Sequence, residues 1–431
     1  MNEVYLARMR TLLGDQYPAY EESLAGPAYR GIRINTLKRP NEPISGICGQ
    51  KSPFAENGWY LEPSCTVGQT PEYLCGHIYP QEPSASYAVT AMSLRPGMRV
   101  LDLCAAPGSK STQIAELLQN QGLLVSNEII SSRAAVLKEN MERCGAANTV
   151  ILNNTPSEVA HVFPAFFDAV LCDAPCSGEG MFRKDPEAVN HWSVEHVSSC
   201  AVRQAAILDD AAECVKPGGL LVYSTCTFSP EENEQNVSAF LERHPDFMPE
   251  AIPSCGGLET DSGYMRRIYP MDGGEGHFVA RLRRSGRAEP YSLPLLKSDP
   301  LPPSAAEFLE ANLTSLFPYI YVRHDVVYGG TVPFFACPGL HLIRHQTLLG
   351  TVRRGRFEPS HALAMSSWTA MKNRVPVSEE TFESYRRGNT VPYQGEKGWF
   401  AVTVRGMQAG LAKGDGSVLK NHYPKAFRIR G

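Results

Sequence analysis

Short apolar runs alternate with helix-length segments between residues 99 and 284, and this regularity constrains the fold more than any other feature. The runs are RVLDLC, LLVSNEI, VIL at 150–152, FFDAVLCD and LLVYSTC. They have the unbroken hydrophobic character of parallel strands that are buried on both faces. Helices are expected at 110–118, 132–143, 194–214 and 230–243, and YMRRIYP and HFVARLRR are expected to close the sheet as an antiparallel hairpin. This order predicts an α/β fold with a doubly wound, Rossmann-like sheet.

Two of the predicted strands end beside a cysteine. Cys176 follows Pro175 after FFDAVLCD, and Cys226 follows Thr225 at the end of LLVYSTC. Chemistry in an open α/β sheet gathers beyond the carboxyl ends of its strands, so both thiols are expected to face one pocket. We interpret Cys226 as a nucleophile and Cys176 as its partner. The alternative at each position is a buried structural cysteine, which is an ordinary role for this residue.

The segment that joins the first strand to the first helix, DLCAAPGSK at 102–110, predicts a ligand-binding loop. Its small residues let a ligand approach the backbone closely, and the N-terminus of the following helix favours negative charge. The loop is neither GxGxxG nor the P-loop pattern, in which glycine directly precedes lysine. Glu128 ends the second strand, where nucleotide-type cofactors meet a carboxylate that accepts both ribose hydroxyls. The alternatives are a purely structural turn at 102–110 and a surface cap or ion pair at Glu128.

A length of 431 residues predicts more than one domain. We expect an N-terminal α+β domain at 1–75, the α/β domain at 76–284, a linker at 285–305, a small domain at 306–374 and a β-rich domain at 375–431. The segment GIRINTLKR at 31–39 alternates apolar and polar residues and predicts a strand with a polar face, for which the alternative is a solvated edge strand. Residues 350–431 carry 14 Lys and Arg against 6 Asp and Glu, although the whole chain has a net charge of −4. A basic end on an acidic body is typical of a phosphate-binding module.

Composition excludes several classes of protein. Apolar residues make up 43% of the chain and charged residues 20%, which is typical of a globular protein without long disorder. No apolar run approaches the roughly 18 residues of a membrane span, and the N-terminus lacks the apolar segment of a signal peptide, so a cytoplasmic protein without a membrane partner is expected. The 12 cysteines are too dilute for a disulfide scaffold and lack the paired spacing of a zinc site, so no metal is expected.

Several segments carry a resemblance to a known family. They are RINTLK (33–38), PQEPSAS (80–86), DLCAAPGSKSTQIA (102–115), NEIISSR (127–133), DAPCSGEGMFRKDP (173–186), YSTCTFSPEENE (223–234) and GGEGHFVARL (273–282). In this order they resemble the Sun-type RNA cytosine methyltransferases. The paired PC and TC signatures separate this family from the DNA cytosine methyltransferases, which use the PC cysteine as nucleophile. The resemblance implies a class I methyltransferase fold with a PUA-like C-terminal region.

The same resemblance implies S-adenosylmethionine as the cofactor and assigns residues to it. The loop residues Cys104, Ala105, Ala106, Pro107, Gly108, Ser109 and Lys110 are expected to hold its methionine part. Glu128 is expected at the ribose, Arg133 near the cofactor, and Asp173 near the methyl donor and the target base. Family members often have an acidic residue after the third strand to meet the adenine. The run LNNTP leaves Asn153 or Asn154 as weaker candidates for that contact.

The chemistry that the resemblance implies is methylation of carbon 5 of cytosine in RNA. This carbon is a poor nucleophile until a thiolate adds to carbon 6, and we assign that attack to Cys226. Lys110 is expected to favour the thiolate, with a simple charge at the helix start as the alternative. Asp173, protonated or sharing a proton, is expected to hydrogen-bond the ring nitrogen. The resemblance gives Cys176 a role in product release.

The expected partner is RNA, with ribosomal RNA of the small subunit preferred, presented as a single-stranded or flipped base. Transfer RNA is the alternative substrate, and a non-catalytic ribosome-assembly factor is the alternative class. Arg183 and Lys184 are expected to meet phosphates at the rim of the pocket. Aromatic and charged residues of the C-terminal end are expected to bind RNA, with a solvated basic surface as the alternative: Tyr393, Trp399, Phe400, Arg405, Lys413 and Lys420. A monomer is expected.

Overall fold

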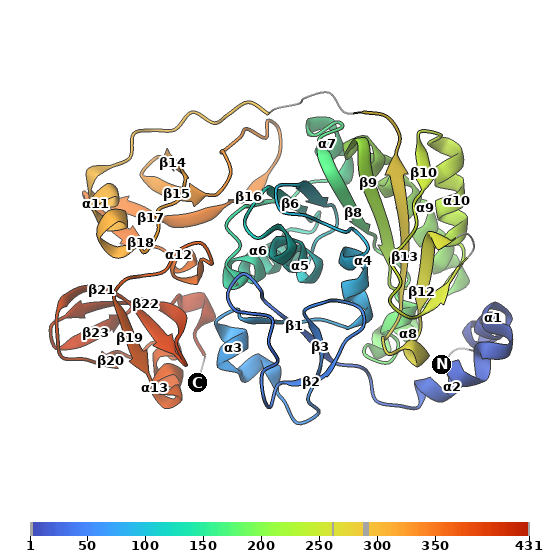
Figure 1. Cartoon of the computed structure of the whole chain (residues 1–431), viewed down its shortest axis with the longest axis horizontal. Coiled ribbons are helices and arrows are strands. Elements are labelled where there is room, and N and C mark those ends of the chain that lie inside the picture. The colour runs from blue at the N-terminus through green and yellow to red at the C-terminus, as the bar shows by residue number, and fades with distance from the viewer. Residues whose placement is uncertain (1–2, 261–262, 288–292, 430–431) are drawn as a thin grey trace.

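The computed structural model describes residues 3–260, 263–287 and 293–429 of the chain (Figure 1). Its centre is a sheet with the parallel strands β5 (Arg99–Asp102), β6 (Leu123–Asn127), β7 (Thr149–Leu152), β8 (Phe167–Asp173) and β9 (Val215–Thr225). Their order is β7-β6-β5-β8-β9. The chain runs outward from β5 to β7 and then returns to place β8 on the other side of β5. This reversal lies at the carboxyl ends of β5 and β8, where open α/β sheets bind their ligands.

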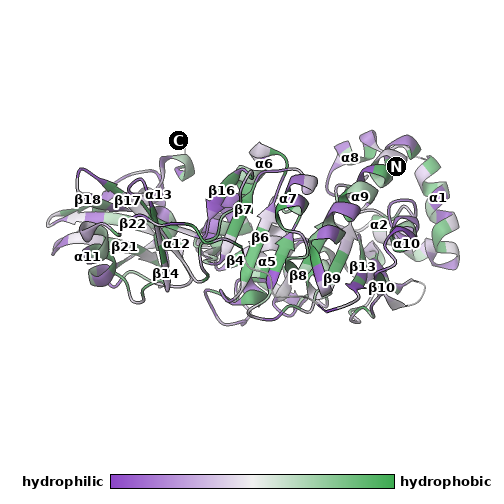
Figure 2. Ribbon diagram, turned by 90° about the horizontal axis from the view of Figure 1, so that it is seen from above, coloured by the Kyte–Doolittle hydropathy of each residue, from purple (hydrophilic) through white to green (hydrophobic). Residues whose placement is uncertain are grey.

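Helices cover both faces of the central sheet, whose strands form a hydrophobic layer (Figure 2). One face, which includes Val100 and Leu171, packs on α4 (Tyr87–Thr90), α5 (Ser109–Leu118) and α6 (Ser131–Cys144). The opposite face, which includes Leu101 and Val170, packs on α7 (Pro156–Val162), α9 (Val194–Cys214) and α10 (Glu234–Arg243). Successive residues of a strand point to opposite faces, so a sheet covered on both sides needs apolar residues at every position. The doubly wound α/β fold expected from the sequence is confirmed.

Antiparallel strands extend this sheet at both edges. On one side lie β13 (His277–Arg284), β12 (Met265–Ile268), β11 (Leu258–Glu259) and β10 (Phe247–Pro249), with β12 and β13 forming the expected hairpin. On the other side β16 (Leu342–His345) pairs with β7. β16 comes from residues 306–374, for which the sequence predicts a separate small domain. It joins the main sheet because it pairs the open edge of β7, whose backbone groups would otherwise lack partners.

The N-terminal segment contacts the α/β domain in two places. A small sheet with the order β2-β3-β1-β4 consists of β2 (Cys48–Lys51), β3 (Gly58–Leu61), β1 (Gly31–Ile34) and β4 (Ile78–Pro80), and α3 (Pro71–Leu74) precedes β4 in the chain. Helices α1 (Glu3–Leu13) and α2 (Tyr17–Leu24) lie apart from this sheet at the far end of the molecule (Figure 1). There they pack on residues of the α/β domain that include Trp192, Phe228 and Tyr269.

Strand β1 lies between β3 and β4, so the alternative of a solvated edge strand is wrong. Its polar face is buried: the Arg33 side chain is 1% exposed and forms an ion pair with Glu116 of α5, which is 2% exposed. The Arg33 guanidinium also donates to the Ser109 carbonyl oxygen at 2.9 Å and to Thr112 Oγ1 at 2.6 Å. The polar face therefore binds the first turn of α5, and the cost of burying its charge is offset by the ion pair and these hydrogen bonds.

The C-terminal part contains two further sheets. The first consists of β14 (Tyr319–Arg323), β15 (Val326–Gly330), β17 (Thr347–Arg353) and β18 (Arg356–Pro359), with α11 (Pro303–Asn312) and α12 (His361–Met365). The second consists of β19 (Arg374–Val377), β21 (Lys397–Val404), β22 (Met407–Asp415), β23 (Val418–Asn421) and β20 (Val391–Pro392), with α13 (Glu379–Arg386). The predicted linker lies partly outside the described residues, and within its described part Leu295 forms a β-bridge with Phe335.

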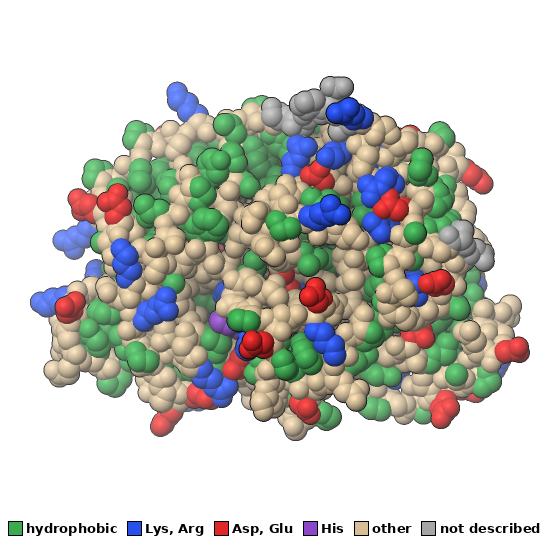
Figure 3. Space-filling view, in the orientation of Figure 1, with side chains coloured by type: hydrophobic (Ala, Val, Ile, Leu, Met, Phe, Trp, Pro, Cys, Tyr) green, Lys and Arg blue, Asp and Glu red, His purple; other side chains and the backbone are tan. Residues whose placement is uncertain are grey.

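The predicted C-terminal RNA-binding residues do not form one surface. Phe400 is buried in the core of the second sheet, and Arg405 is paired with Glu72 and Glu379. Trp399, Lys413 and Lys420, in contrast, lie opposite one another across β21, β22 and β23 and are at least partly exposed. The face of the molecule in Figure 3 mixes cationic and anionic side chains. Among the described residues no helix is long and apolar enough to cross a membrane.

The Arg33–Glu116 pair generates a prediction about stability. Arg33→Met leaves the Glu116 carboxylate buried without its counter-ion, so the free energy of unfolding should fall by about 3–5 kcal/mol. Urea denaturation followed by tryptophan fluorescence measures the loss. The double variant Arg33→Met/Glu116→Leu should recover part of it, because no uncompensated charge remains. Equal stability of Arg33→Met and the unaltered protein would contradict the assignment.

Candidate active site

The two cysteines predicted at strand ends meet in the structure. Strands β8 and β9 run parallel with Asp173 opposite Ser224, and each chain leaves the sheet just beyond this pair. Cys176 Sγ lies 3.0 Å from Cys226 Sγ, and the backbone N–H of Cys226 donates to Cys176 Sγ at 3.3 Å. The hydrogen bond with Cys226, together with burial, raises the pKa of the Cys176 thiol. Cys176 therefore retains its proton while it contacts the second sulfur.

Asp173 and Lys110 form a partly buried ion pair beside the cysteines. Lys110 Nζ lies 2.8 Å from Asp173 Oδ2, and Ser224 Oγ donates to Asp173 Oδ1 at 2.7 Å. Burial acts to raise the pKa of Asp173, but the charge of Lys110 and these hydrogen bonds outweigh it and lower the pKa. Asp173 is therefore ionised, so of the two expected states the protonated one is disfavoured, and a proton shared with Lys110 stays a prediction. The reason is that Lys110 binds the carboxylate directly.

The Lys110 ammonium thus has a carboxylate partner in addition to any effect on the thiol. Burial acts to lower the pKa of Lys110, and the charge and hydrogen bond of Asp173 raise it above its usual range. The charge of a Cys226 thiolate would act in the same direction. Lys110 is a buried site residue, so the alternative of a simple charge at the helix start is wrong.

Sequence reasoning missed His277. It begins β13, whose residue Phe278 pairs with Thr225 at the end of β9, so His277 lies beside the exit of the chain toward Cys226. His277 Nε2 is buried without a hydrogen-bond partner and lies 3.7 Å from Asp173 Oδ1. Burial and the charge of Lys110 lower the pKa of His277 to about 4, so the ring is neutral. Only the pairing of β9 with β13, which a single sequence does not display, reveals its place in the site.

The predicted cofactor loop lies beside this group, between β5 and α5. Its backbone is held by hydrogen bonds from the Ala105 N–H to the Asn127 carbonyl oxygen at 2.8 Å and from Asn140 Nδ2 to the Pro107 carbonyl oxygen at 2.8 Å. Gly108 has φ +110°, and a Cβ atom there would lie 3.1 Å from Leu137 Cδ1, so a side chain would be strained and crowded. Burial raises the pKa of the Cys104 thiol.

A buried acceptor at the start of this loop lacks a partner. Asp102 Oδ2 accepts a hydrogen bond from Ser111 Oγ at 2.6 Å, whereas Asp102 Oδ1 has none. Burial raises the pKa of Asp102 to about 7. An unsatisfied buried oxygen is unusual in a native structure and suits a ligand that brings a hydrogen-bond donor, such as the ammonium of an amino-acid moiety.

Glu128 is buried directly after β6 and not on the surface, although it forms the cap and the ion pair of the alternative interpretation. Its Oε1 accepts from the Ile130 N–H at 2.9 Å, and its Oε2 lies 3.3 Å from the Arg133 guanidinium. Arg133 also donates to the Ala106 carbonyl oxygen at 2.8 Å, which links the carboxylate to the cofactor loop. Ile129 and Ile130 beside it are 57% and 49% exposed, and they place an apolar surface next to the carboxylate.

Two other expectations need correction, and a third stays a prediction. The Asn154 side chain accepts from the His341 N–H at 3.0 Å and donates to the His341 carbonyl oxygen at 3.1 Å, so it holds the chain that leads into β16 and does not present a free amide to an adenine. Arg183 is 8% exposed and binds both oxygens of Glu275, so it cannot meet phosphates. Lys184 is exposed, so its expected contact with phosphates stays a prediction.

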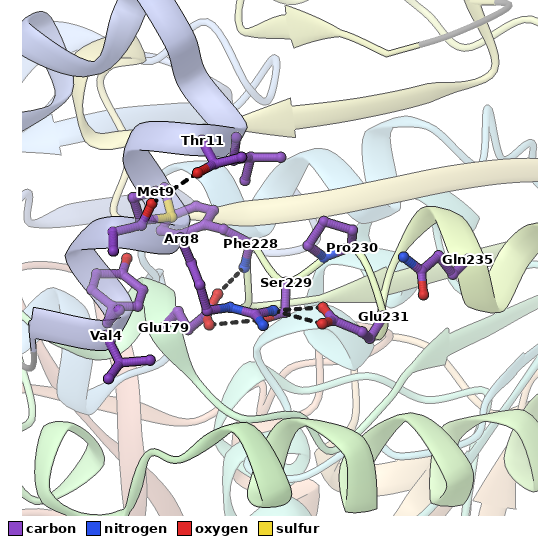
Figure 4. A pocket seen from close by; sticks show the side chains of 13 residues that line it. Val4, Arg8, Met9, Thr11, Glu179, Phe228, Ser229, Pro230, Glu231 and Gln235 are labelled. Carbon is purple, nitrogen blue, oxygen red and sulfur yellow. Dashed lines mark hydrogen bonds and ion pairs between the residues drawn. The ribbon is translucent and has the colours of Figure 1, made fainter.

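A cavity of about 610 Å³ lies away from the cofactor loop, between α1 and the chain that follows Cys226 (Figure 4). Its lining combines apolar atoms of α1 with Phe228 and Pro230, and the Arg8–Glu231 ion pair crosses it at 2.6 Å. Within the described residues no cluster of His, Cys, Asp and Glu could hold a metal ion.

The strand order and the loop after β5 define a class I methyltransferase. The chain belongs to the family of ribosomal RNA small subunit methyltransferase F. It is 35% identical to that protein from Aeromonas salmonicida over 93% of this chain and 90% of the relative, and 32% identical to that from an Enterobacter species over 98% and 94%. A solved methyltransferase homolog from Pyrococcus horikoshii is 29% identical with a TM-score of 0.59, and the match covers 66% of this chain and 95% of that one.

Family matches span most of the chain. Residues 1–83 match the N-terminal domain of 16S rRNA methyltransferase RsmF, and residues 89–283 match 16S rRNA methyltransferase RsmB/F. Residues 307–366 match the first C-terminal domain of RsmF, and residues 372–429 match its PUA domain. The PUA-like C-terminal region expected from the resemblance is therefore confirmed. The cofactor of such a methyltransferase is S-adenosylmethionine.

Glu128 provides a test of the cofactor site. In Glu128→Gln the single acceptor oxygen is needed by the Ile130 N–H, so the ribose hydroxyls lose their acceptor. The affinity for S-adenosylmethionine should fall by about 10- to 100-fold, the loss of one hydrogen bond to a charged group. Isothermal titration calorimetry measures it. Glu158→Gln, which alters an exposed cap of α7, is the matched control and should bind as the unaltered protein does. Unchanged affinity of Glu128→Gln would remove Glu128 from the site.

Proposed function

We propose that the protein transfers a methyl group from S-adenosylmethionine to carbon 5 of cytosine in 16S ribosomal RNA, through a covalent bond between Cys226 and the base. The observation that carries this proposal is the contact of Cys176 and Cys226 at 3.0 Å beside the ionised Asp173. The relatives that share most of the chain's length are small subunit ribosomal RNA methyltransferases, which supports ribosomal RNA as the substrate.

Cys226 makes the target carbon reactive. Its sulfur adds to carbon 6 of cytosine, which pushes electron density onto carbon 5 and divides one difficult step into two easier ones. S-Adenosylmethionine, when bound, supplies the methyl group as an electrophile. The residues that would hold it are Cys104, Ala105, Ala106, Pro107, Gly108, Ser109, Lys110, Glu128 and Arg133, with Asp102 Oδ1 as a further acceptor. The exposed Ile129 and Ile130 offer a flat apolar contact for the adenine in place of Asn154.

The Lys110–Asp173 pair supplies the polar contacts to the base. An ionised Asp173 accepts a hydrogen bond from the exocyclic amine of cytosine, which uracil lacks, and so favours cytosine. Lys110 donates toward the ring edge where negative charge develops after Cys226 has added. The pair is charged before the base arrives, so it needs little reorganisation during the reaction.

Cys176 takes part in the release of the product. After methyl transfer the proton on carbon 5 leaves, the bond between carbon 6 and sulfur breaks, and its electron pair returns to Cys226. Cys176 touches the leaving sulfur and has a raised pKa, which suits a group that exchanges a proton in that step.

The segments outside the α/β domain serve RNA binding in this proposal. We divide the chain at 1–75, 76–284, 306–374 and 375–431, with 285–305 as a linker. The row Trp399, Lys413 and Lys420 combines an aromatic ring with two cations across three strands, which suits an unpaired nucleotide and its phosphate. The target base must leave its stack to reach Cys226, so the remaining RNA has to be held elsewhere. We retain a monomer as the expected state.

Bisulfite sequencing of ribosomal and transfer RNA from cells with and without the gene tests the proposed function. A cytosine in 16S ribosomal RNA that is protected only when the gene is present is the expected result. Protection confined to transfer RNA would change the substrate. Identical protection in both strains, together with binding of S-adenosylmethionine by the purified protein, would favour a non-catalytic assembly factor.

The two cysteines should give opposite phenotypes when replaced. Cys226→Ala removes the attacking sulfur and should abolish methylation of 16S ribosomal RNA in vitro. Cys176→Ala keeps the attack but impairs release, and should accumulate a protein–RNA adduct that resists detergent and disappears with ribonuclease. Methyl incorporation and gel mobility measure these outcomes. Cys255→Ala, at a half-buried cysteine outside the site, is the control. An unchanged methylation rate in Cys226→Ala would overturn the nucleophile assignment.

A further inference from the structure

The two cysteines lie on loops that exchange hydrogen bonds in both directions. We define the PC loop as residues 174–182 and the TC loop as residues 226–233. Each loop contains a buried glutamate, Glu179 in the PC loop and Glu232 in the TC loop. Each glutamate accepts a hydrogen bond from a backbone N–H of the other loop. Each loop therefore holds the other through a glutamate: Glu179 of the PC loop binds the TC loop, and Glu232 of the TC loop binds the PC loop.

Glu179 reaches from the PC loop into the TC loop (Figure 4). Its Oε2 accepts from the Phe228 N–H at 2.7 Å, and its Oε1 accepts from Ser229 Oγ at 2.7 Å. Oε1 also accepts from Trp192 Nε1 at 2.8 Å, which anchors the carboxylate to the body of the domain. Both oxygens are used, and the side chain is 4% exposed. A buried carboxylate needs such donors, and both of its oxygens have them.

Glu232 reaches from the TC loop back into the PC loop. Its Oε2 accepts from the Ser177 N–H at 3.0 Å and from Gln204 Nε2 at 2.7 Å, whereas Oε1 is buried without a partner. Gln204 Nε2 also donates to the Pro175 carbonyl oxygen at 3.0 Å, directly before Cys176. Gln204 of α9 therefore binds both the start of the PC loop and the Glu232 carboxylate that holds this loop.

Direct contacts between the loops surround the sulfurs. The Gly180 N–H donates to the Cys226 carbonyl oxygen at 2.8 Å, and Ser177 Oγ lies 2.8 Å from Thr227 Oγ1. A Cβ atom at Gly180 would lie 2.6 Å from the Gly276 carbonyl oxygen, so this close approach requires glycine. Ser177 and Thr227, which directly follow the two cysteines, are thus joined across the loops.

We propose that Glu179 and Glu232 are positioning residues that hold the two loops as one unit, so that Cys176 stays within reach of Cys226 while the covalent adduct breaks down. The inference rests on the proposed function. Addition to carbon 6 needs Cys226, whereas release needs both sulfurs at the same time. Reacting groups must be held within about 0.5 Å of their productive positions. A small shift of either loop would therefore move Cys176 out of reach of Cys226. Loosening the connection should therefore slow release more than attack.

The two glutamates differ in a way that makes the proposal testable with conservative variants. Gln has one acceptor oxygen and one amide nitrogen, so in Glu179→Gln the nitrogen must face either the Phe228 N–H or the Trp192 N–H. A bond between donors cannot form, and at least one contact is lost. In Glu232→Gln the oxygen can take the position of Oε2 and keep both donors, while the nitrogen takes the place of the unpartnered Oε1. Both substitutions remove the carboxylate, but only Glu179→Gln loses a hydrogen bond of the glutamate that it replaces.

The experiment compares Glu179→Gln, Glu232→Gln, Glu232→Ala and Glu231→Gln in the full-length protein. Glu231 is the matched control because it lies in the TC loop but pairs with Arg8 of α1. The substrate is 16S ribosomal RNA isolated from cells that lack the gene. Glu179→Gln and Glu232→Ala should lower the rate of adduct release by about tenfold, the effect of one hydrogen bond to a charged group, and accumulate adduct as Cys176→Ala does. Glu232→Gln and Glu231→Gln should release normally.

A second measurement needs no RNA. Diamide takes up two hydrogen atoms as two thiols join in a disulfide, and the rate of the Cys176–Cys226 disulfide reports how often the sulfurs meet. Peptide mapping should show a slower rate in Glu179→Gln and Glu232→Ala than in the two controls. Thermal unfolding confirms that each variant is folded. If Glu179→Gln does not fold, Ser229→Ala removes one of its partners and should show the same effects in weaker form.

The outcomes separate the two proposals. Adduct in Cys176→Ala together with normal release and normal disulfide rate in Glu179→Gln would overturn the positioning role alone. Equal defects in Glu232→Gln and Glu232→Ala would show that charge, and not the connection between the loops, is what matters, and would also overturn it. Methylation by Cys226→Ala would instead overturn the proposed function, whatever the glutamate variants do.

Discussion

The parallel pairing of β8 with β9 is the constraint from which the active site follows. Asp173 lies opposite Ser224 in that pairing, and a hydrogen bond joins their side chains. Each chain turns out of the sheet within three residues of this pair, which brings the sulfurs of Cys176 and Cys226 to 3.0 Å. The register of these buried strands places the two sulfurs together, and no long loop is needed to bring them into contact. A rigid sheet thus supplies the precision that chemistry at two sulfurs demands.

Burial determines the charge state of the groups around the sulfurs. Lys110 and Asp173 stay ionised because each is the other's partner, while the pKa of His277 is lowered by burial and by the nearby Lys110 charge. The site therefore holds one cation and one anion close together, with neutral groups beside them. A base that enters it meets a donor and an acceptor whose orientation is already fixed, which is the arrangement that favours charge development in a transition state.

Features that depend on local pattern could be predicted from the sequence, and features that depend on distant partners could not. The apolar runs and the cysteines at their ends predicted the sheet and the meeting of Cys176 with Cys226. The ionised Asp173, the internal position of Arg33 and the pairing of β16 with β7 each depend on residues far away in the chain. A polar residue between apolar ones has the same pattern whether water or a buried counter-ion is its partner, so alternation alone could not distinguish an exposed Arg33 from a buried one.

The N-terminal segment contacts two parts of the site: the cofactor loop and the loops that carry the two cysteines. Arg33 of β1 binds the Ser109 carbonyl oxygen and Thr112, so it holds the end of the cofactor loop. Helices α1 and α2 pack with the aromatic residues Trp192 and Phe228, which flank the carboxylate of Glu179. One segment therefore supports the loop for the methyl donor and the loops that hold the two thiols. Because both supports are buried, each fixes the part of the site that it contacts.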